Sequence, residues 1–215
     1  PFGKTKITGV VWNEFEKNNL KKFKIKKVIN KLDIPSLKKN TINFLNWFSE
    51  YNIVPKGMAL KLVLTGGKEL KSIDQKFYDS LTFNCHDNSI ELTNDQKKSL
   101  EQINSSNKRF NVHVLQGTTG SGKTFVYFEA LKNVLVKGFQ GLILLPEIGL
   151  TTQFEKKFIE FFKFKPAVWH SGITKKNKKI IWEGIIRGKI SVVIGARSSL
   201  FLPFKNLGLI IVDEE

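Results

Sequence analysis

Short apolar runs alternate with amphipathic stretches through the second half of the chain. The runs predict strands at residues 112–116, 142–145, 167–169, 190–194 and 207–212. Between them, apolar residues recur at helical spacing, which predicts helices at 125–136, 152–162 and 174–187. Alternation of strand and helix in this way predicts an α/β fold, with a parallel sheet covered by helices on both faces.

The first part of the chain is patterned differently. Lysines alternate with apolar residues in 6–12 and 22–28, and this period of two predicts antiparallel strands. Apolar residues at helical spacing predict a helix at 41–51, whereas residues 58–64 fit a helix or a strand. A small β-rich module closed by a helix is therefore expected. Trp12 fits a core position or a base-stacking one, and four further aromatic residues are predicted mainly in the core: Phe15, Phe23, Trp47 and Phe48.

A weakly periodic stretch separates the two patterns. Residues 65–91 are mostly polar with scattered aromatics, which predicts a linker. Thr93 then precedes a helical pattern, and Gln96 follows three residues later, which is the spacing of a capping box. The predicted parts are residues 1–64, 65–91 and 92–215.

Composition narrows the class of protein. Of 215 residues, 41% are hydrophobic and 12% aromatic, which excludes a disordered chain. Cys85 is the single cysteine, so neither an internal disulfide nor a cysteine-based zinc site is expected within the sequence. No apolar stretch is long enough for a membrane span, and no signal peptide opens the chain, so we expect a cytoplasmic location. The chain starts at Pro1 and ends on a run of acids, which suggests a fragment.

The net charge is strongly positive. A formal charge of +16 and a pI near 9.8 suit a polyanionic partner such as nucleic acid. An AT-rich coding sequence would also produce a chain rich in Lys, Asn and Ile without any binding purpose. Charge alone therefore leaves DNA binding open.

A phosphate-binding loop lies between the first predicted strand and helix of the second part. The residues that fit G-x-x-x-x-G-K-[ST] are Gly117, Thr118, Thr119, Gly120, Ser121, Gly122, Lys123 and Thr124. Glycines allow backbone N–H groups to surround an anion, the lysine reaches the β- and γ-phosphates, and the threonine hydroxyl can bind Mg²⁺. This pattern predicts a site for a nucleoside triphosphate.

Acidic residues follow the last predicted strand. In an open parallel sheet, ligands bind at the carboxyl ends of the strands, so Asp213 and Glu214 would face the nucleotide. Asp213 is expected to hold Mg²⁺ beside Thr124, and Glu214 to orient and deprotonate the attacking water. Lys123, Asp213 and Glu214 are thus the predicted catalytic residues.

Three further loops follow strands of the same sheet: Leu145–Thr151, His170–Gly172 and Gly195–Phe201. With the phosphate-binding loop and the acidic ending, they resemble the first motor lobe of superfamily 2 helicases, and specifically the primosomal protein N′ family of replication-restart helicases. The resemblance runs from about Thr93 to the end and implies a RecA-like lobe, here incomplete, that uses ATP and Mg²⁺.

The same resemblance implies roles for residues on these loops. Five of them would grip the single-strand backbone without reading its sequence: Pro146, Glu147, Thr151, Arg197 and Ser198. For Arg197, a structural salt bridge is the alternative. Gln96 would contact the adenine edge, but the capping box needs the same side chain, and both roles stay open.

The front of the chain resembles that family's domain that captures the 3′ end of a nascent DNA strand. The similar segments are Pro1–Lys4, the strand Gly9–Val11, and Trp47–Tyr51 with Pro55 and Gly57 beyond it. The resemblance implies that Gly3 lies at the pocket for the 3′-terminal nucleotide, although the preceding strand of that pocket is absent. Residues 1–64 would be the remainder of this domain.

The chain departs from the family pattern in two ways. Residues 65–91 are too few for the winged-helix domain that usually precedes the motor. The second motor lobe, its arginine finger and the family's zinc-binding cysteines are also absent from the sequence, so we expect this fragment alone not to unwind DNA.

The function implied for the full-length protein is that of an ATP-dependent 3′-to-5′ DNA helicase, which recognises stalled forks and restarts replication. Its implied partners are forked and single-stranded DNA, the primosome and single-strand-binding proteins. Two alternatives remain: another superfamily 2 DNA translocase, and a non-catalytic DNA-binding adaptor with a vestigial phosphate-binding loop.

Overall fold

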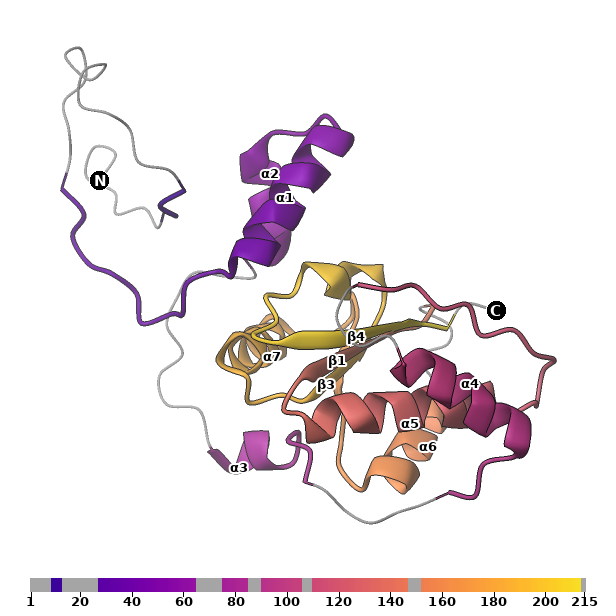
Figure 1. The fold of residues 1–215 in the computed structure, drawn as a ribbon. Coiled ribbons are helices and arrows are strands. Elements are labelled where there is room, and N and C mark those ends of the chain that lie inside the picture. Colours follow the sequence, from indigo (N-terminus) through magenta and orange to yellow (C-terminus); the bar gives the residue numbers. More distant parts are fainter. Residues whose placement is uncertain are drawn as a thin grey trace.

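A computed structural model describes residues 9–12, 27–64, 75–84, 90–105, 110–146 and 152–213 (Figure 1). The helices are α1 (Lys39–Tyr51), α2 (Lys56–Val63), α3 (Gln75–Asp79), α4 (Asn94–Asn104), α5 (Lys123–Val136), α6 (Thr152–Phe162) and α7 (Lys175–Arg187), with a 3₁₀ helix, η3, at Arg197–Phe201. The strands are β1 (Gln140–Leu144), β2 (Ala167–Trp169), β3 (Val192–Gly195) and β4 (Leu207–Val212). Among the described residues, no helix is long and apolar enough to cross a membrane.

The four described strands form one parallel sheet in the order β2-β3-β1-β4. β1 pairs with both β3 and β4, so that Leu142 lies opposite Val193 on one side and Ile210 on the other. Parallel neighbours require crossover connections, and α6 and α7 provide them. The predicted parallel sheet is therefore confirmed.

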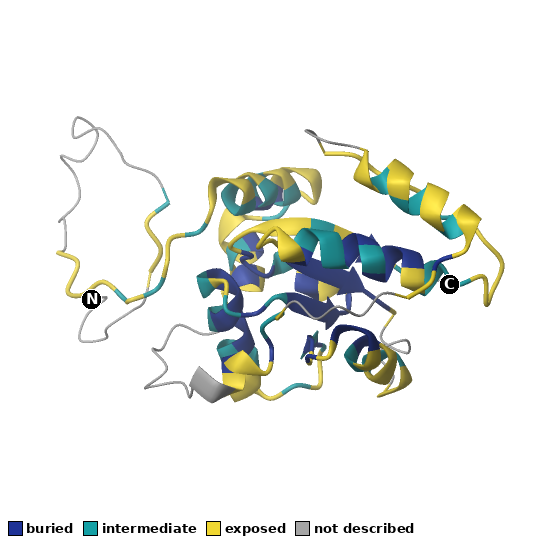
Figure 2. Ribbon diagram, turned by 60° about the horizontal axis from the view of Figure 1, so that its bottom comes forward, coloured by how far each residue is buried: buried dark blue, intermediate teal, exposed yellow. Residues whose placement is uncertain are grey.

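Helices cover both faces of this sheet, and the strand residues divide between the faces with a period of two. Leu142 and Leu144 pack in a cluster with α7, whereas Ile143 packs in a second cluster with α5 and α6. Figure 2 shows the buried strands enclosed between helices whose outer surfaces are exposed. Phe128 on α5 is fully buried and contacts four aromatic rings of the second cluster, which come from residues 154, 158, 161 and 162.

The strand predicted at residues 112–116 is absent from the sheet. Val112 and Val114 are exposed instead, as is most of this segment. A strand requires a neighbour with which to exchange backbone hydrogen bonds, and among the described residues no strand pairs with this segment. Apolar residues alone were therefore not sufficient to make it a strand.

The described residues of the front module are helical rather than β-rich, and the prediction of a β-rich module was wrong for them. α1 and α2 pack together through Leu45, Ala59 and Val63, whereas Gly9–Trp12 forms no strand. Residues 6–8 and 22–26, which carry most of the alternating pattern, lie outside the described residues, as do Phe15 and Phe23. The helix predicted at residues 41–51 is present as α1, and its helical period places Leu45 and Ser49 on one buried face.

Aromatic residues of the front module have more than one environment. Trp12 and Phe48 pack against the α1–α2 cluster, in agreement with a core position. Trp47 is half-exposed, contrary to its predicted burial, because it points away from that cluster and stacks on Tyr51, with ring centroids 5.2 Å apart. The module also contacts the lobe, since Trp182 of α7 donates a hydrogen bond to the carbonyl of Val63.

Residues 75–84, inside the predicted linker, pack against the lobe. Tyr78 is 2% exposed and lies in the α7 cluster, where its hydroxyl donates to the carbonyl of Ile180 (3.1 Å). The Thr82 hydroxyl donates to the carbonyl of Lys189 (2.9 Å), and the Phe83 N–H donates to the Ser191 hydroxyl (2.8 Å). This short segment therefore completes the hydrophobic core on the α7 side of the sheet.

Candidate nucleotide-binding site

Predicted site residues from distant parts of the sequence meet at one edge of the sheet. Pro146 follows β1, Arg197 follows β3 and Asp213 follows β4. Because the strands are parallel, their carboxyl ends share one edge. The predicted phosphate-binding loop leads into α5, which packs on the same sheet. Four predicted site residues lie outside the described residues: Gly3, Glu147, Thr151 and Glu214.

Residues 117–124 form the turn that leads into α5. Gly120 and Gly122 have φ angles of +82° and +81°, a region that glycine occupies without steric strain. A Cβ on Gly122 would clash with Gln96 Nε2, so space as well as conformation favours glycine there. The turn is closed by Ser121, whose N–H donates to the carbonyl of Thr118 (3.1 Å). The result is an exposed, glycine-rich turn at the N-terminus of a helix, where backbone N–H groups and the helix dipole favour an anion.

Lys123 is held over this turn by its own loop. Its Nζ donates to the carbonyls of Gly117 (2.7 Å) and Thr118 (3.1 Å). An ammonium group has three donors, so these two bonds orient the charge without using every donor. The ammonium group of Lys123 therefore lies beside the turn that the sequence motif predicts to bind phosphate.

A partly buried hydrogen bond joins Asp213 to α5. The hydroxyl of Tyr127 donates to Asp213 Oδ2 at 2.7 Å, and the Asp213 N–H donates to the carbonyl of Leu144 in β1 (3.0 Å). Tyr127 is three residues after Thr124 on the same helix, so the two side chains lie on one face of α5. The hydrogen bond therefore brings the acid after β4 toward the helical face that carries the predicted Mg²⁺ ligand Thr124.

Tyr127 was missed by the sequence analysis. The sequence signal was weak: Tyr127 carries a hydroxyl among apolar neighbours of the helix, on the face of Thr124. Nothing in the sequence showed that the acid 86 positions later would accept its hydrogen bond.

Gln96 makes both halves of a capping box and also contacts the phosphate-binding loop. Its Oε1 accepts from the Thr93 N–H (2.9 Å), while its own N–H donates to the Thr93 hydroxyl (3.4 Å). Its Nε2 donates to the carbonyl of Ser121 (3.0 Å). The capping role is thus present, and the same amide links the start of α4 to the loop.

The exposed side of η3 carries two of the predicted DNA-binding residues. Arg197 and Ser198 are exposed, whereas Ser199 is fully buried and its hydroxyl donates to the carbonyl of Ala196 (2.6 Å). That inner contact fixes the start of η3 while its outer side chains face solvent. Pro146 is exposed at the end of β1 on the same edge. Surface residues of this kind can contact a phosphate backbone without reading bases.

The donor set fits a nucleotide-bound magnesium better than a metal held by the protein alone. Among the described residues, no group of three or more His, Cys, Asp or Glu side chains could hold a metal ion. Thr124 and Asp213 supply one hydroxyl and one carboxylate, and Mg²⁺ in such sites usually completes its shell with phosphate oxygens and water. The chemistry of the residues present therefore fits Mg²⁺ carried by a nucleoside triphosphate.

Comparison with known families identifies the lobe. Residues 93–215 match the sequence pattern of DEAD/DEAH box helicases. The chain belongs to the DEAD/DEAH box helicase family. Residues 1–65 of the chain match a second family, described as a 3′DNA-binding domain (3′BD). A region for DNA 3′ ends thus precedes the helicase region, as the resemblance implied.

The individual relatives of this chain are named replication restart proteins. The chain is 42% identical over 218 residues to replication restart protein PriA of Rickettsia felis, covering 100% of this chain and 32% of the relative. The corresponding protein of Bacillus subtilis is 41% identical over 128 residues, which cover 59% of this chain and 16% of that protein. The chain therefore spans about a third of the length of the Rickettsia relative and is similar to its part with 3′ DNA-binding and helicase regions.

Proposed function

We propose that this chain is the 3′-end-binding and nucleotide-binding part of an ATP-dependent 3′-to-5′ DNA helicase that restarts replication at stalled forks. The observation that carries the proposal is the Tyr127–Asp213 hydrogen bond, which joins the end of β4 to the helix that follows the phosphate-binding loop. An acid held in this way beside a phosphate-binding loop suits hydrolysis of a nucleoside triphosphate.

In this proposal each residue of the edge has a distinct task. The N–H groups of residues 117–124 surround the triphosphate, and Lys123 turns toward the β- and γ-phosphates. Thr124 and Asp213 bind Mg²⁺, and Glu214 orients and deprotonates the attacking water. Bound Mg²⁺–ATP supplies the phosphoryl group whose hydrolysis drives movement. Gln96 reads the adenine edge while it caps α4.

The DNA contacts are divided between two parts of the chain. Pro146, Glu147, Thr151, Arg197 and Ser198 hold the single-strand backbone at the carboxyl edge of the sheet. Residues 1–64 recognise a free 3′ end, with Gly3 at the terminal nucleotide. Residues 65–91 join them without a winged-helix domain. A charge of +16 supports this polyanionic partner.

The longer protein supplies what a single lobe cannot. Hydrolysis requires a second lobe with an arginine that stabilises charge on the transferred phosphoryl group, a contribution of about 10³-fold or more. We therefore propose that the chain by itself binds nucleotide and DNA but does not unwind DNA. Zn²⁺ in a cysteine cluster, primosome proteins and single-strand-binding proteins belong to the longer cytoplasmic protein.

Two substitutions in the longer protein test the enzymatic part. Lys123→Ala and Asp213→Ala should each reduce ATP turnover by at least about 10²-fold, because each removes a charged group from the phosphate site. Lys137→Ala, at an exposed position just after α5, is the matched control and should leave turnover unchanged. If turnover survives both site substitutions, the chain acts as a DNA-binding adaptor and the enzymatic proposal is wrong.

A second experiment tests the restart role separately from hydrolysis. Binding of the longer protein to a fork with a leading-strand 3′ hydroxyl is compared with binding to the same fork carrying a 3′ phosphate. The proposal requires a clear preference for the hydroxyl end at every salt concentration. Equal affinities would indicate a different superfamily 2 translocase, in which charge alone drives association.

A further inference from the structure

A basic pocket lies on the lobe, away from the candidate nucleotide-binding site. It has a volume of about 400 Å³ and lies between the segment that leads into α1, the end of α7 and the turn before β4. Its floor contains three buried residues, Ile186, Pro203 and Phe204. Four cations line it: Lys38, Arg187, Lys189 and Lys205. None of the described residues that line it carries a carboxylate.

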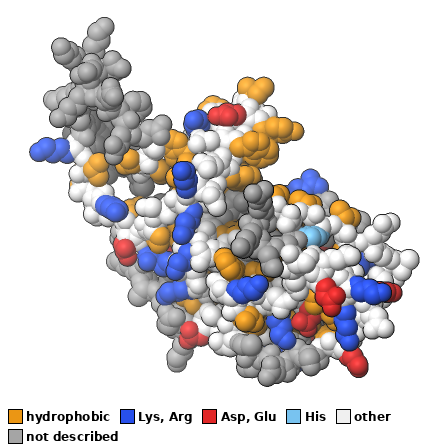
Figure 3. Space-filling model, in the orientation of Figure 1, with side chains coloured by type: hydrophobic (Ala, Val, Ile, Leu, Met, Phe, Trp, Pro, Cys, Tyr) orange, Lys and Arg blue, Asp and Glu red, His pale blue; other side chains and the backbone are white. Residues whose placement is uncertain are grey.

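This pocket is at the opposite edge of the sheet from the phosphate-binding loop. α7 ends at Arg187 and the chain then enters β3, so the pocket adjoins the amino ends of the strands. The phosphate-binding loop and Asp213 are at the carboxyl ends. In Figure 3, Lys and Arg side chains gather over the α7 side of the lobe. A ligand here would not occupy the nucleotide site.

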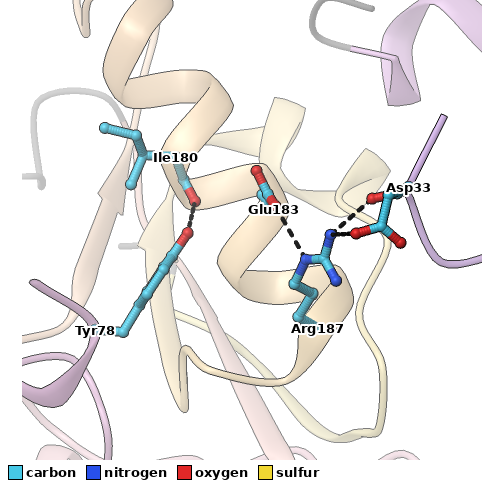
Figure 4. A network of polar contacts seen from close by, with 5 residues as sticks. All are labelled: Asp33, Tyr78, Ile180, Glu183 and Arg187. Carbon is cyan, nitrogen blue, oxygen red and sulfur yellow. Dashed lines mark hydrogen bonds and ion pairs between the residues drawn. The ribbon is translucent and has the colours of Figure 1, made fainter. Parts of the chain in front are cut away.

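The pocket is built by a polar network that holds the front segment against α7 (Figure 4). Arg187 donates through Nη2 to the carbonyl of Asp33 (2.7 Å), and Nε donates to Glu183 Oε1 (3.0 Å). Burial would lower the pKa of Arg187, but the Glu183 carboxylate and then Asp33 outweigh this and raise the pKa above its ordinary value. Arg187 is therefore a permanently charged link between the two walls of the pocket.

The three lysines of the pocket differ in their contacts with the rest of the protein. Lys38 caps the start of α1 without a side-chain hydrogen bond to the helix, and its side chain is exposed. The Lys205 Nζ lies 3.5 Å from the carbonyl of Arg187, a long contact for an exposed ammonium group. Lys189 is half-buried, with its Nζ 5.1 Å from the centre of the Tyr78 ring. Lys38 and Lys205 thus present charge to solvent from two different segments of the lining, one before α1 and one before β4.

We propose that this pocket binds the sugar-phosphate backbone of DNA, as a contact additional to the loops at the carboxyl edge. Lys38 and Lys205 bind phosphate oxygens, and the apolar floor of Pro203 and Phe204 packs against deoxyribose. Such contacts hold DNA without reading its sequence. The inference rests on the proposed DNA-binding function and adds that the strand or duplex arm also contacts the junction between the front module and the lobe.

Paired substitutions in the longer protein test this site. The variant Lys38→Ala with Lys205→Ala removes two cations from the pocket. The control Lys137→Ala with Lys163→Ala removes two exposed cations that follow α5 and α6 and do not line the pocket, so the net charge changes equally. Affinity for forked DNA is measured by fluorescence anisotropy between 50 and 200 mM salt, and affinity for a fluorescent ATP analogue is measured alongside.

The pocket variant should make the plot of log affinity against log salt shallower by about 1.8, since each phosphate contact contributes about 0.9. Its DNA affinity at 0.1 M salt should fall on the order of tenfold. The control variant should keep the DNA affinity and the salt dependence of the original protein. The pocket variant should keep the original affinity for ATP and the original thermal midpoint. Lys38→Arg with Lys205→Arg should restore the slope.

Other outcomes have distinct meanings. Equal losses in the pocket variant and the control would show that overall charge drives binding, and would overturn the pocket proposal. Unchanged DNA binding in the pocket variant would also overturn it, while leaving the proposed helicase function intact. If the unaltered protein binds neither DNA nor ATP, the proposed function itself fails.

Discussion

The Tyr127 hydroxyl donates a hydrogen bond of 2.7 Å to Asp213 Oδ2, and this bond joins a helix that begins at the phosphate-binding loop to the last strand of the sheet. Both partners are at least partly buried. Hydrogen bonds to a charged group contribute about 1.5–3 kcal/mol, more than bonds between neutral groups. The orientation of the Asp213 carboxylate is therefore set by α5 as well as by its own strand.

Tyr127→Phe in the longer protein should raise the Mg²⁺ concentration that supports half-maximal ATP turnover by about tenfold. The ring still packs against Phe128, with centroids 5.3 Å apart, so the change removes mainly the hydrogen bond. A Mg²⁺ titration of ATP hydrolysis measures the effect, with Tyr51→Phe on the exposed side of α1 as the control. An unchanged Mg²⁺ dependence would show that Asp213 does not need Tyr127 for metal binding.

Two substitutions at Gln96 separate its capping role from a nucleotide role. Gln96→Glu keeps an acceptor for the Thr93 N–H but loses the donor to the Ser121 carbonyl, so stability should stay nearly constant while nucleotide affinity falls. Gln96→Ala loses both and should also destabilise the fold by about 0.5–1 kcal/mol. Urea unfolding and a fluorescent ATP analogue measure the two effects. If Gln96→Glu binds nucleotide normally, Gln96 is a cap alone.

Gly122→Ala should destabilise the protein by about 1–2 kcal/mol, since a left-handed conformation is costly for any residue with a Cβ. The new methyl group would also displace Gln96 from the loop. Gly57→Ala is the matched control, because its Cβ would meet nothing within 4 Å and α2 gains helix propensity. Urea unfolding should therefore show opposite signs for the two variants, and equal effects would contradict the structure.

Stability should decrease between pH 10 and pH 12 through Tyr78. Burial, followed by the Glu183 carboxylate, raises the pKa of Tyr78 from 10.0 to about 12, against a smaller lowering by Arg187. The unfolded chain therefore loses this proton first, and the free energy of unfolding falls as the pH rises through that window. Below pH 10 this contribution is fully present.

Urea unfolding of the original chain and of Tyr78→Phe at pH 9 and pH 11.5 measures this effect. Tyr78→Phe loses the hydrogen bond to Ile180 at both values, but its stability should change less between them. The difference isolates Tyr78 from the lysines, which titrate in both proteins. Identical changes in the two proteins would exclude Tyr78 as the source.

Local pattern predicted much of the fold. The bounds of α6 were predicted correctly at 152–162, because its apolar residues keep a strict helical period. The Thr93–Gln96 spacing predicted the start of α4, because a capping box is made by residues close in sequence. Helix bounds and helix caps could be predicted because they depend on residues that are close together in the sequence.

The features that sequence could not supply depend on distant partners. Residues 112–116 include apolar residues, as the true strands do, but strand formation is decided by a neighbour that no local pattern reveals. Tyr127 and Asp213 are similarly joined across 86 positions. The packing of Tyr78 into the α7 cluster, from a stretch with weak periodicity, depends on a surface formed by later residues.

Among the described residues, β4 pairs with β1 alone, and no described strand pairs with its other edge. Leu207, Ile210 and Val212 on this strand are all exposed. An uncovered edge of this kind is a template for strands of other molecules, because its N–H and C=O groups can pair with any extended chain. We therefore expect solutions of the isolated chain to self-associate as concentration rises, through a β-type contact that a short competing strand peptide would suppress.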